Sequence, residues 1–130
     1  MKRLKVILSE NLTQKKIERV EKPWGYELIW AHTQDYVAKI LFIKAGHALS
    51  LQFHHKKEET MFIESGQCQI ETGPNENNLT SLPFSPGETF HIPPGRLHRI
   101  HAQTDCRIFE VSTPHLDDVV RLQDKYGRTS

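Results

Sequence analysis

Residues 46–66 read GHALSLQFHHKKEETMFIESG, and this stretch decides the fold that we predict. Gln52 and His54 are two residues apart, so on a β-strand their side chains point to the same face. The charged residues 55–58 indicate a turn, after which Glu59 opens a second strand and faces back across the pair. Amide, imidazole and carboxylate groups that converge in this way are typical ligands of a divalent transition-metal ion.

A second, distant segment would supply another ligand. His98 follows the turn at residues 93–95 and comes from a different expected strand. The charged run beginning at His54 can also be interpreted simply as a solvated turn. The alternation of the candidate ligands with Leu51 and Phe53, together with the second glycine turn followed by a histidine, favours the metal site.

Short apolar runs separated by Gly, Pro and polar residues continue along most of the chain. We expect strands over residues 26–31, 36–43, 50–54, 59–63, 67–71, 89–92, 97–101 and 107–111. Many short strands at regular spacing predict an all-β antiparallel sandwich or barrel. Near the end, Thr113-Pro114 looks like a helix cap followed by proline at the first helical position. We therefore expect a short C-terminal helix carrying Leu116, Val119 and Leu122.

Length and composition fit one domain. The chain has 130 residues, 37% of them hydrophobic, which suffices for one core. We expect an N-terminal arm over residues 1–22 and a single domain over residues 23–130. A formal net charge of +1 gives no general preference for nucleic acid or membranes. We find no signal peptide or membrane span, so a cytoplasmic protein is expected. The thiols of Cys68 and Cys106 are expected to be free.

The spacing within residues 46–66 resembles the first cupin motif, with Gln52 where many cupins have histidine. Residues 87–98 look like the second cupin motif, and Ala102 replaces the asparagine that usually closes it. The resemblance implies the cupin double-stranded β-helix, a jelly-roll barrel. It also implies that a metal ion is held inside the mouth of the barrel by four ligands: Gln52, His54, Glu59 and His98.

Other segments narrow the resemblance to one family. The sequences PWGYE at 23–27, DDVVR at 117–121 and DKYGR at 124–128 look like the type II mannose-6-phosphate isomerase domain. That domain also occurs fused to mannose-1-phosphate guanylyltransferase. The chain departs from the family pattern beside the expected metal, where Thr60-Met61 replaces His-Trp and Lys57 replaces arginine. These departures bear on the identity of the substrate more than on the fold.

The resemblance implies a metal-dependent aldose–ketose isomerase that acts on mannose 6-phosphate and fructose 6-phosphate, or on a related sugar phosphate, through a metal-stabilised enediolate. Zinc is the first metal expected, with manganese, iron, cobalt or nickel as alternatives, because two imidazoles disfavour calcium and magnesium. Glu110, on the inward face of the last long strand, is a candidate general base. It has an alternative role as a hydrogen-bond partner that orients a ligand histidine. His101 is a weaker candidate base.

Basic residues at the rim would contact the phosphate of such a substrate. Lys57 and Arg121, together with Glu110, form the candidate catalytic set, although Lys57 could be a solvated turn residue and Arg121 part of a structural salt bridge. Arg99, Lys125 and Arg128 are further candidates for the phosphate.

Two other functions remain open. His54, Glu59 and His98 also form the two-histidine, one-carboxylate set of a non-heme iron dioxygenase, although Gln52 takes a position that dioxygen would need. The chain could instead be a non-catalytic sugar-binding cupin. The expected partner is a small-molecule sugar or sugar phosphate, with no nucleic acid or membrane, and a homodimer is expected by analogy with other cupins.

Overall fold

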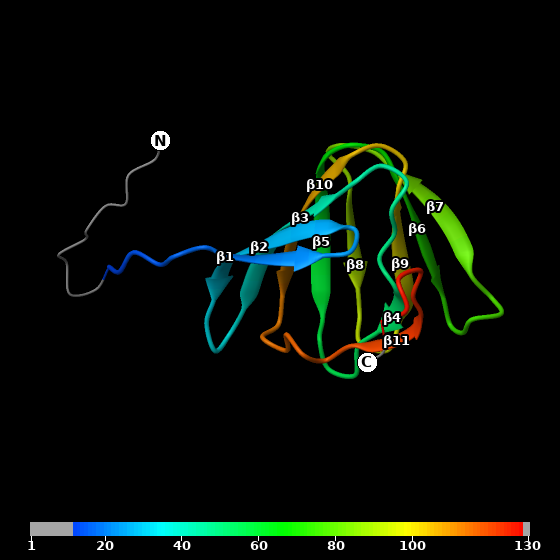
Figure 1. Cartoon of the computed structure of the whole chain (residues 1–130). Coiled ribbons are helices and arrows are strands. Elements are labelled where there is room, and N and C mark those ends of the chain that lie inside the picture. The colour runs from blue at the N-terminus through cyan, green and yellow to red at the C-terminus, as the bar shows by residue number, and fades with distance from the viewer. Residues whose placement is uncertain (1–11, 129–130) are drawn as a thin grey trace.

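The computed structural model describes residues 12–128. Within that range the regular secondary structure consists of β-strands alone (Figure 1). They are β1 (Glu18–Lys22), β2 (Gly25–His32), β3 (Val37–Ile43), β4 (Leu51–Phe53), β5 (Glu59–Ser65), β6 (Cys68–Gly73), β7 (Thr80–Phe84), β8 (Thr89–Ile92), β9 (Leu97–Ala102), β10 (Cys106–Ser112) and β11 (Val120–Gln123). The described range contains no helix with the length and hydropathy needed to cross a bilayer.

The strands form two antiparallel sheets that curve around a common interior (Figure 1). One sheet has the order β1-β2-β3-β10-β5-β8, and the other has the order β11-β4-β9-β6-β7. Strands that are neighbours in space are distant in sequence, as when β10 lies between β3 and β5. The expected all-β jelly roll is confirmed, and each of the eight expected strands is present.

Three strands were not predicted from the sequence, namely β1, β7 and β11, and each lies at the edge of its sheet. β7 contains Pro83 and is largely exposed, which is compatible only with an edge position since proline has no N–H to donate. β1 is an edge strand of the other, six-stranded sheet, where it pairs with β2. It comprises the last five residues of the expected N-terminal arm. Residues 1–11 of that arm lie outside the described residues, so the boundary between arm and domain stays a prediction.

The expected C-terminal helix is wrong. Val120–Gln123 forms β11, which pairs with β4. Thr113 does not cap a helix, since its Oγ1 accepts a hydrogen bond from the backbone N–H of Glu58 at 3.0 Å. Val119 and Val120 are β-branched and suit an extended backbone. The pairing partner offered by β4 therefore outweighs the weak local signal for a helix.

The inward face of the six-stranded sheet changes character along its strands. At one end Leu41 on β3 faces Ile108 on β10, and both belong to the apolar core shared with the other sheet. Two residues further along, Lys39 on β3 faces Glu110 on β10, and both side chains are again buried. The strands thus carry an apolar core at one end of the barrel and a charged interior at the other.

Gly66, in the turn between β5 and β6, has a backbone conformation and an environment that only glycine fits. Its φ is +92°, and a Cβ placed on it would lie 2.2 Å from the carbonyl oxygen of Asp105. Gly46 provides a contrast, because its φ is +80° but nothing lies within 4 Å of a Cβ.

We expect Gly66→Ala to lower the free energy of unfolding by about 3 kcal/mol, since it combines left-handed strain with a backbone clash. Gly46→Ala should lower it by only about 1 kcal/mol, because strain alone applies there. Chemical denaturation of the two variants measures both values. Equal losses would contradict the clash at Gly66.

Candidate metal centre

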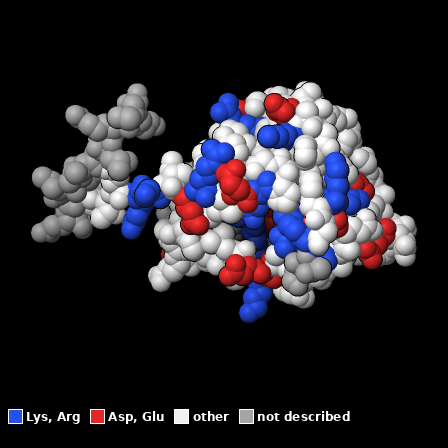
Figure 2. All heavy atoms as spheres, in the orientation of Figure 1, with Lys and Arg blue, Asp and Glu red and all other residues white. Residues whose placement is uncertain are grey.

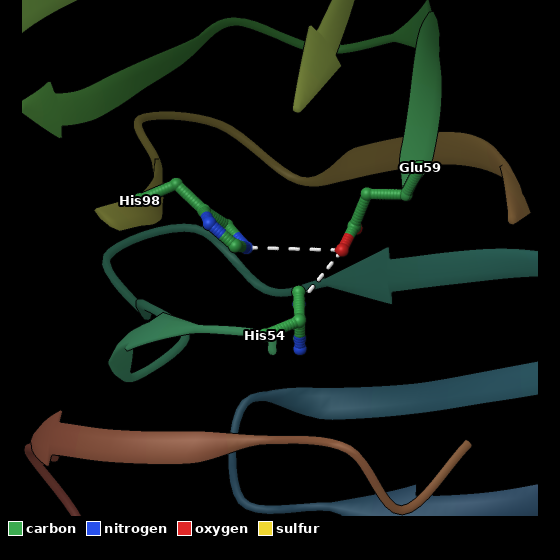
Figure 3. A group of neighbouring side chains, drawn as sticks. All are labelled: His54, Glu59 and His98. Atoms are coloured by element: carbon green, nitrogen blue, oxygen red, sulfur yellow. Dashed lines mark ion pairs between the residues drawn. The ribbon is translucent and has the colours of Figure 1, made fainter. Parts of the chain in front are cut away.

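Three of the candidate ligands meet in the charged interior, and they come from both sheets (Figure 3). His54 directly follows β4, Glu59 is the first residue of β5, and His98 is the second residue of β9. Their exposed fractions are 4%, 2% and 2%. The three side chains point at one another, with one ligand atom from each lying within 4.8 Å of the others.

The distances suit a shared ion. Oε2 of Glu59 lies 2.8 Å from Nε2 of His54 and 3.9 Å from Nε2 of His98. Ligands that are each about 2.1 Å from one metal ion are separated by about 3 to 4 Å. The two imidazole rings are tilted by 48° with centroids 5.1 Å apart, so they approach from different directions.

The hydrogen bond at Nδ1 of each imidazole determines the role that Nε2 can take. Nδ1 of His54 contacts the backbone carbonyl of Asp118, and Nδ1 of His98 contacts the carbonyl of Arg96 at 3.0 Å. A carbonyl can only accept, so each Nδ1 carries a hydrogen and each Nε2 is the ring nitrogen that faces Glu59 and is available to a metal ion. Burial, the largest influence on His98, lowers its pKa and so favours the neutral ring.

Glu59 is an ionised carboxylate in this arrangement. Burial alone would raise its pKa, but the neighbouring His54 and the ammonium of Lys57 outweigh burial and lower the pKa to about 2. Its Oε2 is buried and has no hydrogen bond of proper geometry, despite the nearby nitrogens. Two imidazole nitrogens and one carboxylate oxygen without a hydrogen bond, all facing a common point, are a donor set that fits a divalent cation.

Gln52 lines the same cavity as these three residues. It is the Cα partner of His98 where β4 pairs with β9. Ser50, Gln52 and His54 all line the cavity, as the alternation of a strand requires. Its role as a fourth ligand stays a prediction.

The candidate base, Glu110, is buried beside the cluster. Nζ of Lys57 lies 3.1 Å from Oε2 of Glu110 and 3.7 Å from Oε2 of Glu59, so one ammonium joins the two carboxylates. Burial, supported by the charge of Glu59, raises the pKa of Glu110, while Lys57 and Lys39 oppose that rise. A buried carboxyl group with a raised pKa in a cavity has the character of a general acid or base.

The interpretation of Lys57 as a solvated turn residue is wrong, because only 6% of it is exposed. Arg121 and Arg128 also line the cavity, and Arg128 forms an ion pair with Asp124 at 2.9 Å. The two remaining phosphate candidates and the second candidate base lie elsewhere. Arg99 and His101 both contact Glu71, and Lys125 donates to the carbonyl of Gly46 at 2.7 Å.

The sequence analysis missed three charged residues of the cavity wall, namely Lys22, Glu27 and Lys39. Nζ of Lys39 lies 3.2 Å from Oε1 of Glu27, and Lys22 lies 3.8 Å from the same oxygen. A signal for Lys39 was available, because it occupies an inward position in the alternating run that begins at Val37. A charged residue at such a position belongs to a polar interior more often than to a packed core.

Positive side chains outnumber negative ones around the cavity. Five are basic and three are acidic: Lys22, Lys39, Lys57, Arg121 and Arg128 against Glu27, Glu59 and Glu110. Figure 2 shows Lys and Arg side chains gathered, with acidic side chains among them, on the face that carries β1 and β11 in Figure 1. A metal ion would add further positive charge, so the cavity favours an anionic ligand.

Comparisons with known proteins bear on what this cavity does. The profile of the family described as Mannose-6-phosphate isomerase C-terminal matches residues 9–124. XanB, a xanthan biosynthesis protein of Xanthomonas campestris pv. campestris, is 32% identical over 117 residues, which cover 85% of this chain and 24% of XanB. The alginate biosynthesis protein AlgA of Pseudomonas putida is 32% identical over 124 residues, covering 91% of this chain and 24% of AlgA.

A third relative is the mannose-1-phosphate guanylyltransferase ManC of Salmonella typhimurium, which is 33% identical over 115 residues, covering 84% of this chain and 23% of ManC. The chain therefore spans about a quarter of the length of the curated relatives it matches.

Solved structures share the fold at low sequence identity. The capsular polysaccharide assembling protein CapF from Staphylococcus aureus has a TM-score of 0.73 and 20% identity, covering 90% of this chain and 37% of CapF. The oxalate decarboxylase of Lactobacillus farciminis has a TM-score of 0.69 and 20% identity, covering 82% of this chain and 33% of that chain. These likenesses establish the architecture and leave the chemistry to the site itself.

We expect the folded chain to bind one divalent transition-metal ion, measured by titration calorimetry and by metal analysis after dialysis. His54→Ala, Glu59→Gln and His98→Ala should each weaken binding by 100-fold or more, at about 1.4 kcal/mol per tenfold. His101→Ala is the matched control, because His101 contacts Glu71 and does not line the cavity. Undiminished binding by the three ligand variants would sink the metal centre.

Proposed function

This chain belongs to the family of mannose-6-phosphate isomerase C-terminal domains, and on that premise we propose that it is a metal-dependent aldose–ketose isomerase of sugar phosphates. Mannose 6-phosphate and fructose 6-phosphate are the substrate pair that we propose. The observation that carries the proposal is the Lys57–Glu110 pair, buried beside a ready set of metal ligands in a cavity with an excess of basic side chains.

Gln52, His54, Glu59 and His98 would hold the ion, with zinc as the first expectation and manganese, iron, cobalt or nickel as alternatives. When bound, a divalent ion supplies positive charge that stabilises negative charge developing on the substrate's oxygens. The hydrogen bonds at Nδ1 orient both imidazoles toward the ion's position, and the ionised carboxylate of Glu59 would supply a negative charge to it.

Glu110 is the group that we propose moves the proton between C2 and C1. It is 4% exposed, and burial raises its pKa above that of an ordinary glutamate, so the group accepts a proton more readily than a solvated carboxylate does. Aldose–ketose isomerisation needs such a group, because the proton that leaves one carbon must be delivered to its neighbour. Lys57 holds the carboxylate of Glu110 at 3.1 Å and neutralises it when it is ionised.

The phosphate of the substrate would lie against Arg121 and Arg128, which line the cavity from the C-terminal part of the chain. Lys22 is close enough for its charge to interact with both guanidinium groups, and the three cations repel one another. A bound phosphate would relieve that repulsion, so a phosphorylated sugar should bind better than its unphosphorylated form.

The function is tested by following the conversion of mannose 6-phosphate to fructose 6-phosphate under anaerobic conditions. We expect turnover that chelator abolishes and added metal restores. Glu110→Gln should lower kcat by about 10²- to 10⁴-fold, the usual contribution of general acid–base catalysis. Glu71→Gln, on a glutamate that does not line the cavity, is the matched control.

Other outcomes would redirect the proposal. Oxygen consumption with added iron would point to a dioxygenase, and saturable sugar binding without turnover would point to a binding protein. Either result in place of isomerisation would overturn the proposed reaction while keeping the cavity.

We also propose a homodimer, formed through the outer face of the six-stranded sheet. Phe62 on β5 and Phe109 on β10 are Cα partners whose rings stack at 6.1 Å, and Val111 lies two residues further along. Their exposed fractions are 38%, 39% and 55%, which is unusual for apolar side chains that adjoin one another. Sedimentation equilibrium should give twice the chain mass, and Phe109→Lys should give monomers. A wild-type monomer at micromolar concentration would contradict the dimer.

A further inference from the structure

Asp118 lies outside the candidate ligand set but is hydrogen-bonded to the metal-ligand turn, residues 54–57 between β4 and β5. Its carboxylate accepts hydrogen bonds from the backbone N–H groups of His55, Lys56 and Lys57 at 3.0, 2.6 and 2.9 Å. Its backbone carbonyl accepts the Nδ1 hydrogen of His54. One residue of the C-terminal segment (residues 113–123) therefore holds four consecutive residues of the turn between β4 and β5.

The carboxylate of Asp118 meets a need that the backbone of the turn creates. Three successive N–H groups that point in one direction need an acceptor, and a carboxylate is the strongest one a side chain can supply. The C-terminal segment is also fastened to the turn at its start, where the N–H of Thr113 donates to the carbonyl of Glu58 at 3.0 Å. Beyond Asp118, β11 pairs with β4, so that Arg121 faces Gln52.

The turn delivers two of the groups that the proposed function needs. His54 at its start is a candidate metal ligand, and Lys57 is the ammonium between Glu59 and Glu110. Both are buried, although the residues between them, His55 and Lys56, are exposed. The backbone must therefore bend inward at both ends of the turn, and the acceptor that fixes this bend is Asp118.

We propose that Asp118 is a positioning residue that fixes the tautomer and direction of His54 and the inward placement of Lys57. The proposal rests on the proposed function only in that His54 is taken as a metal ligand and Lys57 as the partner of Glu110. Asp118 itself is not among the residues that line the cavity. A substitution of Asp118 keeps the backbone carbonyl on Nδ1 of His54 but removes the carboxylate that holds residue 118 against the turn. Loss of such outer contacts to a metal-ligating histidine commonly changes metal affinity 10- to 100-fold.

The test compares Asp118→Ala and Asp118→Asn with Asp117→Ala, a matched control one residue earlier whose side chain is exposed. We expect metal affinity, measured by titration calorimetry on folded protein, to fall 10- to 100-fold for Asp118→Ala. Asp118→Asn should lose less, because an amide oxygen can still accept part of the hydrogen bonds. Asp117→Ala should bind as the wild type does.

A second measurement separates positioning from mere stabilisation and needs no metal. Nitrogen-15 spectra of the histidine rings should show the Nδ1–H tautomer of His54 in the wild type. Asp118→Ala should show a mixture of tautomers, because the carbonyl is no longer held in place by the carboxylate, and Asp118→Asn should show a smaller proportion of the second tautomer. Lower thermal stability with unchanged tautomer and unchanged metal affinity would overturn the proposal. Should Asp118→Ala fail to fold, the Asn variant decides.

The failure of this proposal can be told apart from failure of the proposed function. A wild type that binds metal tightly but converts no sugar phosphate overturns the isomerase and leaves the Asp118 comparison intact. If the wild type binds no metal, the proposed metal centre is overturned. The tautomer of His54 then becomes the one measurement that supports or overturns the role of Asp118.

Discussion

The negative charge of Glu59 is the constraint on which the rest of the site depends. A carboxylate that is 2% exposed is costly unless cations or donors surround it. The nearest neighbours do not fully meet that need, because Oε2 of Glu59 has no hydrogen bond of proper geometry to either imidazole. Lys57 helps, but its ammonium is shared with Glu110. A divalent cation between the three donors would balance the carboxylate and engage both imidazoles.

Glu59 lies in the charged part of the barrel interior, which is separate from the apolar core. Across the charged part the signs alternate, from Glu27 to Lys39, Glu110, Lys57 and Glu59. Buried ion pairs contribute little to stability beyond what apolar residues of similar size would give. Five buried charged groups in a domain of this size are therefore better explained by the cavity they line than by the fold they belong to.

Local patterns carried the prediction of the fold and of where the candidate ligands lie. Strand alternation placed Glu110 on the inward face, and the spacing of the two motifs singled out His54, Glu59 and His98, which the structure brings together. The family resemblance and the jelly-roll architecture are confirmed. The errors arose where a contact with a residue distant in sequence outweighed the local preference of the segment. Residues 120–123 pair with β4 instead of forming a helix, and Lys57 is drawn into the interior instead of remaining in solvent.

The sequence by itself determined the strand pattern, the turn glycines and the identity of the candidate ligands, since each depends on residues a few positions apart. Only the tertiary structure decided which tautomer His54 adopts, which charges neighbour Glu110, and what holds the metal-ligand turn. The partners that settle the turn and the tautomer are separated by 55 to 64 residues along the chain. No local preference encodes such a contact, because it exists only once the two sheets have closed on each other.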